Sequence, residues 1–274
     1  MSVSSTRSRA LPPLRIMPTM TSARRSWRMV ERNVYAYRRT WYVFLSGFLE
    51  PVLFLLSIGV GVGSLVGSLQ IGGDTVSYKQ FVAPGLLASA AMIGALLDTT
   101  FNFFVKYKYS HTYDAIVATP LTAVDIALGE IGWALIRGAL YSGAFLVTML
   151  LFGLVPSWWA LLAVPAAVLI GFAFAAIGLA CTTYMRSWVD FDYVNLAIVP
   201  LFLFSATFFP ITEYAAGLQA VIRVTPLYQG VALVRGLVLA HVEWFMLVHV
   251  VYLVVVGLVG LRVASRRIVR LLQP

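Results

Sequence analysis

The sequence predicts an all-α polytopic membrane protein with six transmembrane helices. Of its 274 residues, 60% are hydrophobic and only 11% are charged, and the mean hydropathy is +0.87. Several apolar runs exceed the roughly 18 residues that indicate a membrane-spanning helix. Polar and basic segments separate these runs. Together these observations exclude a soluble domain.

The N-terminal region is expected to stay on the membrane surface. Residues 1–21 contain Arg, Ser and Pro without the apolar run of a signal peptide, and predict a disordered cytosolic tail. Over residues 22–41, apolar side chains recur at spacings of three and four, from Trp27 to Trp41, while the arginines fall elsewhere around the helix. This pattern predicts an interfacial amphipathic helix that contacts membrane lipids. The alternative is an ordinary basic flank to the first span.

Residues 42–274 are expected to form one six-span transmembrane domain. The predicted spans cover residues 42–66, 81–105, 124–153, 160–182, 193–209 and 243–263. The first span contains Glu50-Pro51 and the glycines Gly59, Gly63 and Gly67, whose four-residue spacing favours close approach of another helix. The alternative is that these glycines loosen the end of the helix.

Two irregular regions interrupt the spans. Within the loop 106–122, the sequence TYDAIVAT predicts a two-turn helix that begins after Thr112 and ends at Pro120. Such a short solvated helix needs a partner groove to be stable. Residues 210–240 are apolar but broken at Thr225-Pro226. They predict two half-helices at the outer face, each too short for a core of about 30 Å.

Positive charges predict the orientation. Sixteen Lys and Arg residues fall in the proposed inner segments, against Lys79, Arg223 and Arg235 in the outer ones. The positive-inside rule therefore places both termini in the cytosol of a cell with this chain in its inner or plasma membrane. The basic residues gather at the two ends of the chain, which favours contact with anionic lipid over nucleic acid.

Four ionisable residues lie inside the predicted spans. Glu50, Asp98 and Glu130 are at similar distances from the cytosolic face, and Arg137 lies deeper. In one interpretation the carboxylates bind Arg137 or helix-end backbone groups and tie the spans together. In the other, they line a cytosolic vestibule or move during gating.

The sequence contains no HExxH, GxSxG or GxxxxGK[ST] motif. It therefore predicts no catalytic residue, no metal site and no cofactor on this chain.

Four strings carry a resemblance to a known family: Glu50-Pro51 followed by LFLLSIGVGVG, then VSYKQFVAPGLLA, TYDAIVATPLTAVDIALGE and FSATFFPITEYAAGLQAVIRVTPL. With the order of the parts, they resemble the permease subunit of type-2 ABC exporters. More narrowly, they resemble permeases that export nodulation-factor lipo-oligosaccharides and related drug-export permeases. The resemblance covers nearly the whole chain beyond Arg24.

The resemblance implies that ATP is bound by a subunit separate from the permease. The segment from Tyr113 to Thr119 would be a coupling helix that docks on a separate ATP-binding subunit, with Arg186 in a second, smaller contact. The expected docking residues are Tyr113, Asp114, Ala115, Ile116, Val117 and Thr119. Two ATP-binding subunits, which carry ATP and Mg²⁺, would work with two permease chains, either identical or paralogous.

The substrate pathway would then run between two permease chains, walled by the first, second and fifth spans. Four phenylalanines are the expected apolar lining: Phe202, Phe204, Phe208 and Phe209. The implied cargo is amphipathic or lipid-linked: a lipo-oligosaccharide, a glycolipid or a drug. The alternative function is an ion-gradient-driven secondary transporter or a channel, which would need no ATPase.

Overall fold

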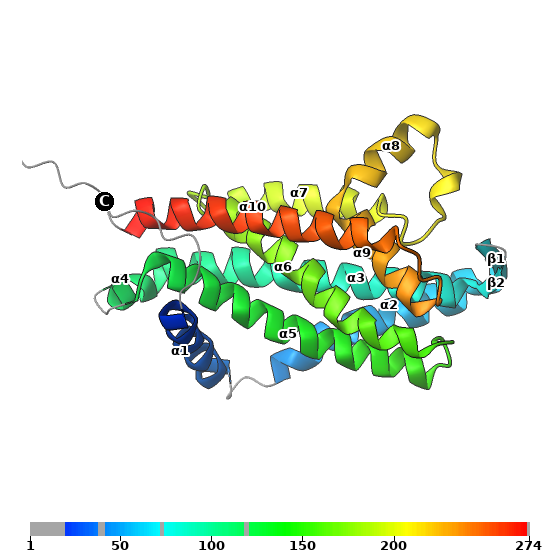
Figure 1. The fold of residues 1–274 in the computed structure, drawn as a ribbon, viewed down its shortest axis with the longest axis horizontal. Coiled ribbons are helices and arrows are strands. Elements are labelled where there is room, and N and C mark those ends of the chain that lie inside the picture. The colour runs from blue at the N-terminus through cyan, green and yellow to red at the C-terminus, as the bar shows by residue number, and fades with distance from the viewer. Residues whose placement is uncertain (1–19, 38–41, 72–73, 118–120, 273–274) are drawn as a thin grey trace, which may run out of the picture.

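The computed structural model describes residues 20–37, 42–71, 74–117 and 121–272, and shows an all-α polytopic membrane protein (Figure 1). The principal helices are α1 (Met20–Tyr37), α2 (Tyr42–Val66), α3 (Tyr78–Leu97), α4 (Thr112–Val117), α5 (Ala123–Leu151), α6 (Ala163–Thr182), α7 (Asp190–Leu203), α8 (Ala216–Val224), α9 (Pro226–Val238) and α10 (Met246–Leu272). Residues 1–19 of the predicted tail lie outside the described residues.

Five described stretches are long and apolar enough to cross a membrane. They are Leu49–Val66, Tyr78–Tyr109, Ala123–Leu151, Trp158–Thr182 and Met246–Leu271. The α8–α9 pair, bent by 86°, is a sixth if it is counted as one broken span. Hydropathy therefore predicted correctly that the chain is a polytopic membrane protein. The irregular segments between the long helices have other bounds than predicted.

The predicted fifth span is shorter than expected. Helix α7 has 14 residues, which is about 21 Å of helix against a hydrocarbon core of about 30 Å. It ends because Ser205 donates a hydrogen bond to the Phe202 carbonyl, and because Ala206 has a left-handed φ of 57°. Hydroxyl groups that bind the nearby backbone compete with helix hydrogen bonding. The prediction that the helix continues to residue 209 was wrong.

The second span continues further than predicted. After α3, two π-helical segments, Asp98–Asn102 and Val105–Tyr109, extend the helical stretch to Tyr109. Lys106 therefore lies on the end of this helix instead of in a loop. The predicted polar loop after α2 is also more ordered than expected, because β1 (Ser68–Ile71) pairs with β2 (Asp74–Ser77) as an antiparallel hairpin.

Two glycines of α2 lie against the first turn of α3. An added Cβ at Gly59 or Gly63 would meet the Lys79 side chain, and Gly67 ends the helix with φ of 71°. Gly59 and Gly63 therefore face another helix, as the close-approach interpretation expects, whereas Gly67 lies at the end of α2, as the alternative expects.

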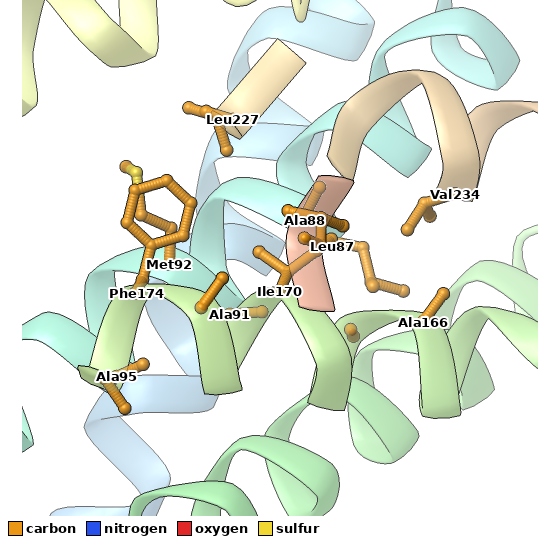
Figure 2. Close-up of a cluster of buried hydrophobic side chains, with 14 of the residues drawn as sticks. Leu87, Ala88, Ala91, Met92, Ala95, Ala166, Ile170, Phe174, Leu227 and Val234 are labelled. Carbon is orange, nitrogen blue, oxygen red and sulfur yellow. The ribbon is translucent and has the colours of Figure 1, made fainter. Parts of the chain in front are cut away.

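The core of the bundle surrounds α6. This helix packs against α3, α5, α9 and α10. Figure 2 shows α3 residues such as Leu87 and Met92 beside Ile170 and Phe174 of α6, with α9 next to them. Gly230 of α9 is so close to α6 that an added Cβ would lie 2.7 Å from Ile170 Cδ1. Of the two predicted half-helices, α9 is thus part of the core, whereas α8 is mostly exposed.

The two ends of the bundle differ. Helices α1 and α4 and the C-terminal end of α10 lie at one end, and the hairpin and α8 lie at the other (Figure 1). Basic side chains of α1, of the Val105–Tyr109 segment and of the last turns of α10 thus gather at one end.

Candidate functional site

The predicted coupling helix is α4, at the end of the bundle that also holds α1. It begins at Thr112 and is described as far as Val117, so Asp114, Ala115 and Val117 belong to it. Thr119 lies outside the described residues. His111, with a left-handed φ of 45°, lies between the long second helix and α4.

Two of the predicted docking residues point into the protein. Tyr113 is fully buried, and Ile116 is 9% exposed. The Tyr113 ring stacks on Phe103, with 4.9 Å between ring centroids. These two side chains hold α4 against the bundle, so they are not available as direct contacts for a separate subunit.

A buried polar cluster anchors α4 to three other elements. We name it the Glu130 cluster, and it consists of Asn33 of α1, Lys106, Tyr113 of α4 and Glu130 of α5. Lys106 Nζ lies 2.6 Å from Glu130 Oε2, and the Tyr113 hydroxyl donates to Glu130 Oε1 at 3.0 Å. Asn33 Nδ2 donates to Glu130 Oε2 at 3.2 Å, and Lys106 Nζ donates to Asn33 Oδ1 at 3.2 Å.

The environment of this cluster favours one protonation state. Burial, and then the neighbouring Glu130 carboxylate, raise the pKa of Tyr113 well above its usual range. The phenol therefore stays protonated and remains a donor. Because the charges of Lys106 and Glu130 compensate each other, the buried carboxylate is both paired and hydrogen-bonded, as buried charges need to be.

A second ion pair lies deeper in the bundle. Arg137 Nη1 of α5 is 2.8 Å from Asp98 Oδ1, and both side chains are largely buried. Asn102 donates to the same Asp98 oxygen at 2.7 Å. The guanidinium also lies 5.5 Å from the Tyr37 ring and 5.6 Å from the Tyr141 ring. The interpretation in which the intramembrane carboxylates bind Arg137 therefore holds for Asp98. Glu130 binds Lys106 instead.

Glu50 is separate from both ion pairs and lines a cavity of about 620 Å³. Apart from Tyr37 of α1, the lining comes from α2, α3 and the segment after it, α5 and α7. The apolar and aromatic wall includes Phe54, Leu86, Ile93, Phe101, Ile198 and Phe202, while Glu50, Asp98, Asn102, Arg137, Tyr37 and Tyr141 supply polar atoms. The cavity is thus amphipathic.

A family model described as ABC-2 type transporter matches residues 24–239. The chain belongs to the ABC-2 type transporter family. The permease is 32% identical to Nodulation protein J of Rhizobium leguminosarum bv. trifolii over 251 residues, which cover 89% of this chain and 93% of the relative. It is 31% identical to Nodulation protein J of Rhizobium meliloti over 216 residues, or 78% of this chain and 79% of the relative.

A more distant similarity joins the permease to another membrane protein. It is 25% identical to the inner membrane transport permease YadH of Escherichia coli over 206 residues, or 73% of both chains. The chain is accordingly a multi-pass ABC transporter permease, the transmembrane subunit of its transporter.

The predicted lining residues of the permease separate into different environments. Phe202 lines the cavity, and Phe208 is buried against it with 5.1 Å between ring centroids. Phe204 is 42% exposed and packs near Tyr214, and Phe209 is 54% exposed. The four phenylalanines therefore do not share one surface within this chain.

Arg186 is exposed, and its backbone N–H donates to Asp190 Oδ2 at 2.6 Å. The Ser187 N–H does the same at 3.0 Å, and these two bonds hold the pKa of Asp190 below its usual range. The turn before α7 is thereby fixed.

Sequence reasoning missed an aromatic cluster that joins this turn to the end of the second helix. Its members are Phe101, Phe104, Tyr109, Trp188 and Phe191, with ring centroids 5.1 to 6.1 Å apart in the closest pairs. The only available signal was the density of aromatic residues on both sides of the membrane boundary. The turn that carries Arg186 is thus packed against the helix that leads into α4.

Proposed function

We propose that this permease is the transmembrane part of an ATP-driven exporter. It moves an amphipathic or lipid-linked substrate, such as a lipo-oligosaccharide, a glycolipid or a drug, from the cytosol or inner leaflet. Two ATP-binding subunits, which hold ATP and Mg²⁺, act on two permease chains in the inner or plasma membrane. The sequence has no P-loop motif of its own, so the nucleotide must bind elsewhere.

The Glu130 cluster is the observation that supports this function most directly. It connects the small helix α4 to α1, to the end of the second helix and to α5 through hydrogen bonds of 2.6 to 3.2 Å. A displacement of α4 by a docked subunit therefore acts on the second and third long helices, which reach from this end into the cavity wall.

The basic end of the bundle supports the orientation. Segments with many Lys and Arg residues favour the cytosolic side. In this proposed orientation, α4, α1 and the C-terminal end of α10 are in reach of a cytosolic ATPase, and the hairpin and α8 are on the outer side.

The test is a mild-detergent pull-down of the tagged permease from its native membrane, with ATP hydrolysis measured in the eluate. We expect a P-loop ATPase in about a one-to-one ratio with the permease. Asp114→Lys is expected to abolish its recovery. The matched control is Glu213→Lys, which makes the same change of charge at the opposite end of the molecule.

Ile116 is not a suitable position for a second charged substitution in this test, because its side chain is buried and a charge there would disturb folding. Recovery of the ATPase with Asp114→Lys at the wild-type level would contradict the assignment of α4. Absence of any ATPase, even after crosslinking, would favour ion-gradient-driven transport instead.

A further inference from the structure

The charges that line the cavity do not cancel. Asp98 and Arg137 form an ion pair of 2.8 Å, and Tyr37 and Tyr141 flank the guanidinium. This cation is therefore already engaged and is poorly placed to bind an anionic ligand. Glu50 is the third charged residue of the lining, and it leaves a net charge of one negative unit.

Glu50 has no compensating group within the described part of the chain. Its side chain is exposed to the cavity, and no ion pair or hydrogen bond joins it to another described residue. A carboxylate within a membrane span is costly unless a partner or water compensates it. A ligand with a positive group would supply that partner.

The walls of the cavity suit the rest of such a ligand. Five aromatic residues contribute to the lining: Tyr37, Phe54, Phe101, Tyr141 and Phe202. The Phe54 and Phe202 rings meet edge to face, with 6.3 Å between their centroids, on the α2 and α7 sides. Aromatic faces attract cations and bury apolar groups, so they bind organic ammonium and phosphonium ions well.

We propose that this cavity binds amphipathic cations, with Glu50 as the counter-charge and the aromatic wall around the apolar body. This inference rests on the proposed function, because it narrows the substrate class of the exporter to amphiphiles that carry a positive group. An amphipathic anion would meet the uncompensated Glu50 carboxylate and would find Arg137 already bound.

The experiment uses the full chain in lipid nanodiscs of zwitterionic phosphatidylcholine, without any ATPase. Binding of radiolabelled tetraphenylphosphonium, and in separate samples of tetraphenylborate, an anion of the same shape, is measured by equilibrium dialysis, with empty nanodiscs as the baseline. We expect saturable binding of the cation above this baseline and none of the anion. Glu50→Gln is expected to weaken this binding roughly tenfold, and Glu50→Asp is expected to retain most of it.

The matched control is Glu213→Gln, which removes the same charge outside the cavity and should leave binding unchanged. If Glu50→Gln does not yield a folded protein, Gly94→Phe takes its place. No atom lies within 4 Å of an added Cβ at Gly94, so the ring is expected to fill the cavity and abolish binding while the fold is kept.

Three results would overturn the inference: no saturable binding of tetraphenylphosphonium, saturable binding of tetraphenylborate with equal affinity, or unchanged binding of the cation in the folded Glu50→Gln or Gly94→Phe variant. Since binding needs no ATPase, it is independent of the pull-down. An ATPase partner without cation binding contradicts only the ligand class, whereas cation binding without an ATPase contradicts only the ATP-driven mechanism.

Discussion

Acidic residues at similar sequence depths have three different environments in this chain. Glu130 is bound by a lysine, a tyrosine and an asparagine, Asp98 is paired with Arg137, and Glu50 faces a cavity. The difference follows from neighbours on other helices, which no local pattern specifies. Each environment leads to a different expectation for mutation.

Glu130→Gln removes the charge that compensates Lys106, whose side chain is only 15% exposed. We expect the loss of about 3 kcal/mol of unfolding free energy, because the ammonium is left buried without its partner. Thermal unfolding in detergent measures this loss. Lys106→Met combined with Glu130→Gln should recover much of it, and Lys108→Met, at an exposed position, should have little effect. Additive losses in the double variant would contradict the proposed pairing.

Arg235 stabilises the irregular segment after α7. Its Nη2 donates to the Ala206 carbonyl at 2.8 Å and to the Thr207 carbonyl at 3.3 Å, while Nε donates to the Phe81 carbonyl at 3.2 Å. The guanidinium also lies 3.9 Å from the centroid of the Phe81 ring. One side chain thus satisfies the Ala206 and Thr207 carbonyls, which follow the end of α7, and ties them to the first turn of α3.

Arg235→Met should therefore destabilise the protein by about 2 to 4 kcal/mol, since several buried carbonyls lose their donor. Arg235→Lys should recover only part of this, because a single ammonium cannot reproduce the fork of the guanidinium. The measurement is thermal unfolding in detergent, with exposed Arg223→Met as the control. Equal stability of the methionine variant and the wild type would show that these bonds are not needed.

At the scale of elements, small residues decide how closely α10 approaches α6. An added Cβ at Gly260 would lie 2.9 Å from the Ala176 carbonyl carbon and 3.0 Å from the Ile177 nitrogen. At Gly257 it would lie 2.3 Å from Phe172 Cε1. The first contact is with backbone, which cannot move aside as a side chain can.

Gly260→Ala is expected to push the two helices apart and to cost about 1 to 3 kcal/mol. Gly143→Ala on α5 is the matched control, since no atom lies within 4 Å of the added methyl group. The control should be neutral or stabilising by up to about 1 kcal/mol, because alanine favours a helix more than glycine does. Equal melting temperatures for the two variants would refute the packing argument.

At the scale of the whole molecule, the basic end and the opposite end should face different compartments. Cys181 is the single cysteine of the chain, so a Cys181→Ser background permits site-specific labelling. Gly217→Cys on α8 should react with a membrane-impermeant maleimide in intact cells. Ser187→Cys, in the turn before α7, should react only in inverted vesicles. The opposite pattern would reverse the orientation.

Hydropathy was sufficient for the membrane class and for the positions of the long helices, because both depend on local composition. The predicted break at Thr225-Pro226 is present, since the Thr225 side chain accepts from the Tyr228 N–H and Pro226 begins α9. The end of α7 and the extension of the second helix depend on hydroxyl groups, an arginine and aromatic packing from distant segments. They were therefore not predictable from local sequence.

The candidate site was predictable as separate parts and not as an arrangement. Tyr113 and Glu130 were both selected from the sequence, but for different roles, and the structure joins them by a hydrogen bond of 3.0 Å. Asn33 was not selected at all, because it is 97 residues from Glu130 and has no local feature that suggests a buried partner. The inward direction of Tyr113 likewise depends on Phe103 of another helix.

The docking of α1 on α5 has a consequence for biogenesis. An added Cβ at Gly129 would lie 2.3 Å from Met29 Cβ, so α1 packs closely on a helix made much later in synthesis. Since chains are made from the N-terminus, α1 leaves the ribosome before α5 exists. Its amphipathic pattern lets it stay bound at the headgroup layer while α2 and α3 are inserted. The Glu130 cluster can form only after α5 has been made. Attachment of α4 to the bundle therefore requires that the first half of the chain has assembled.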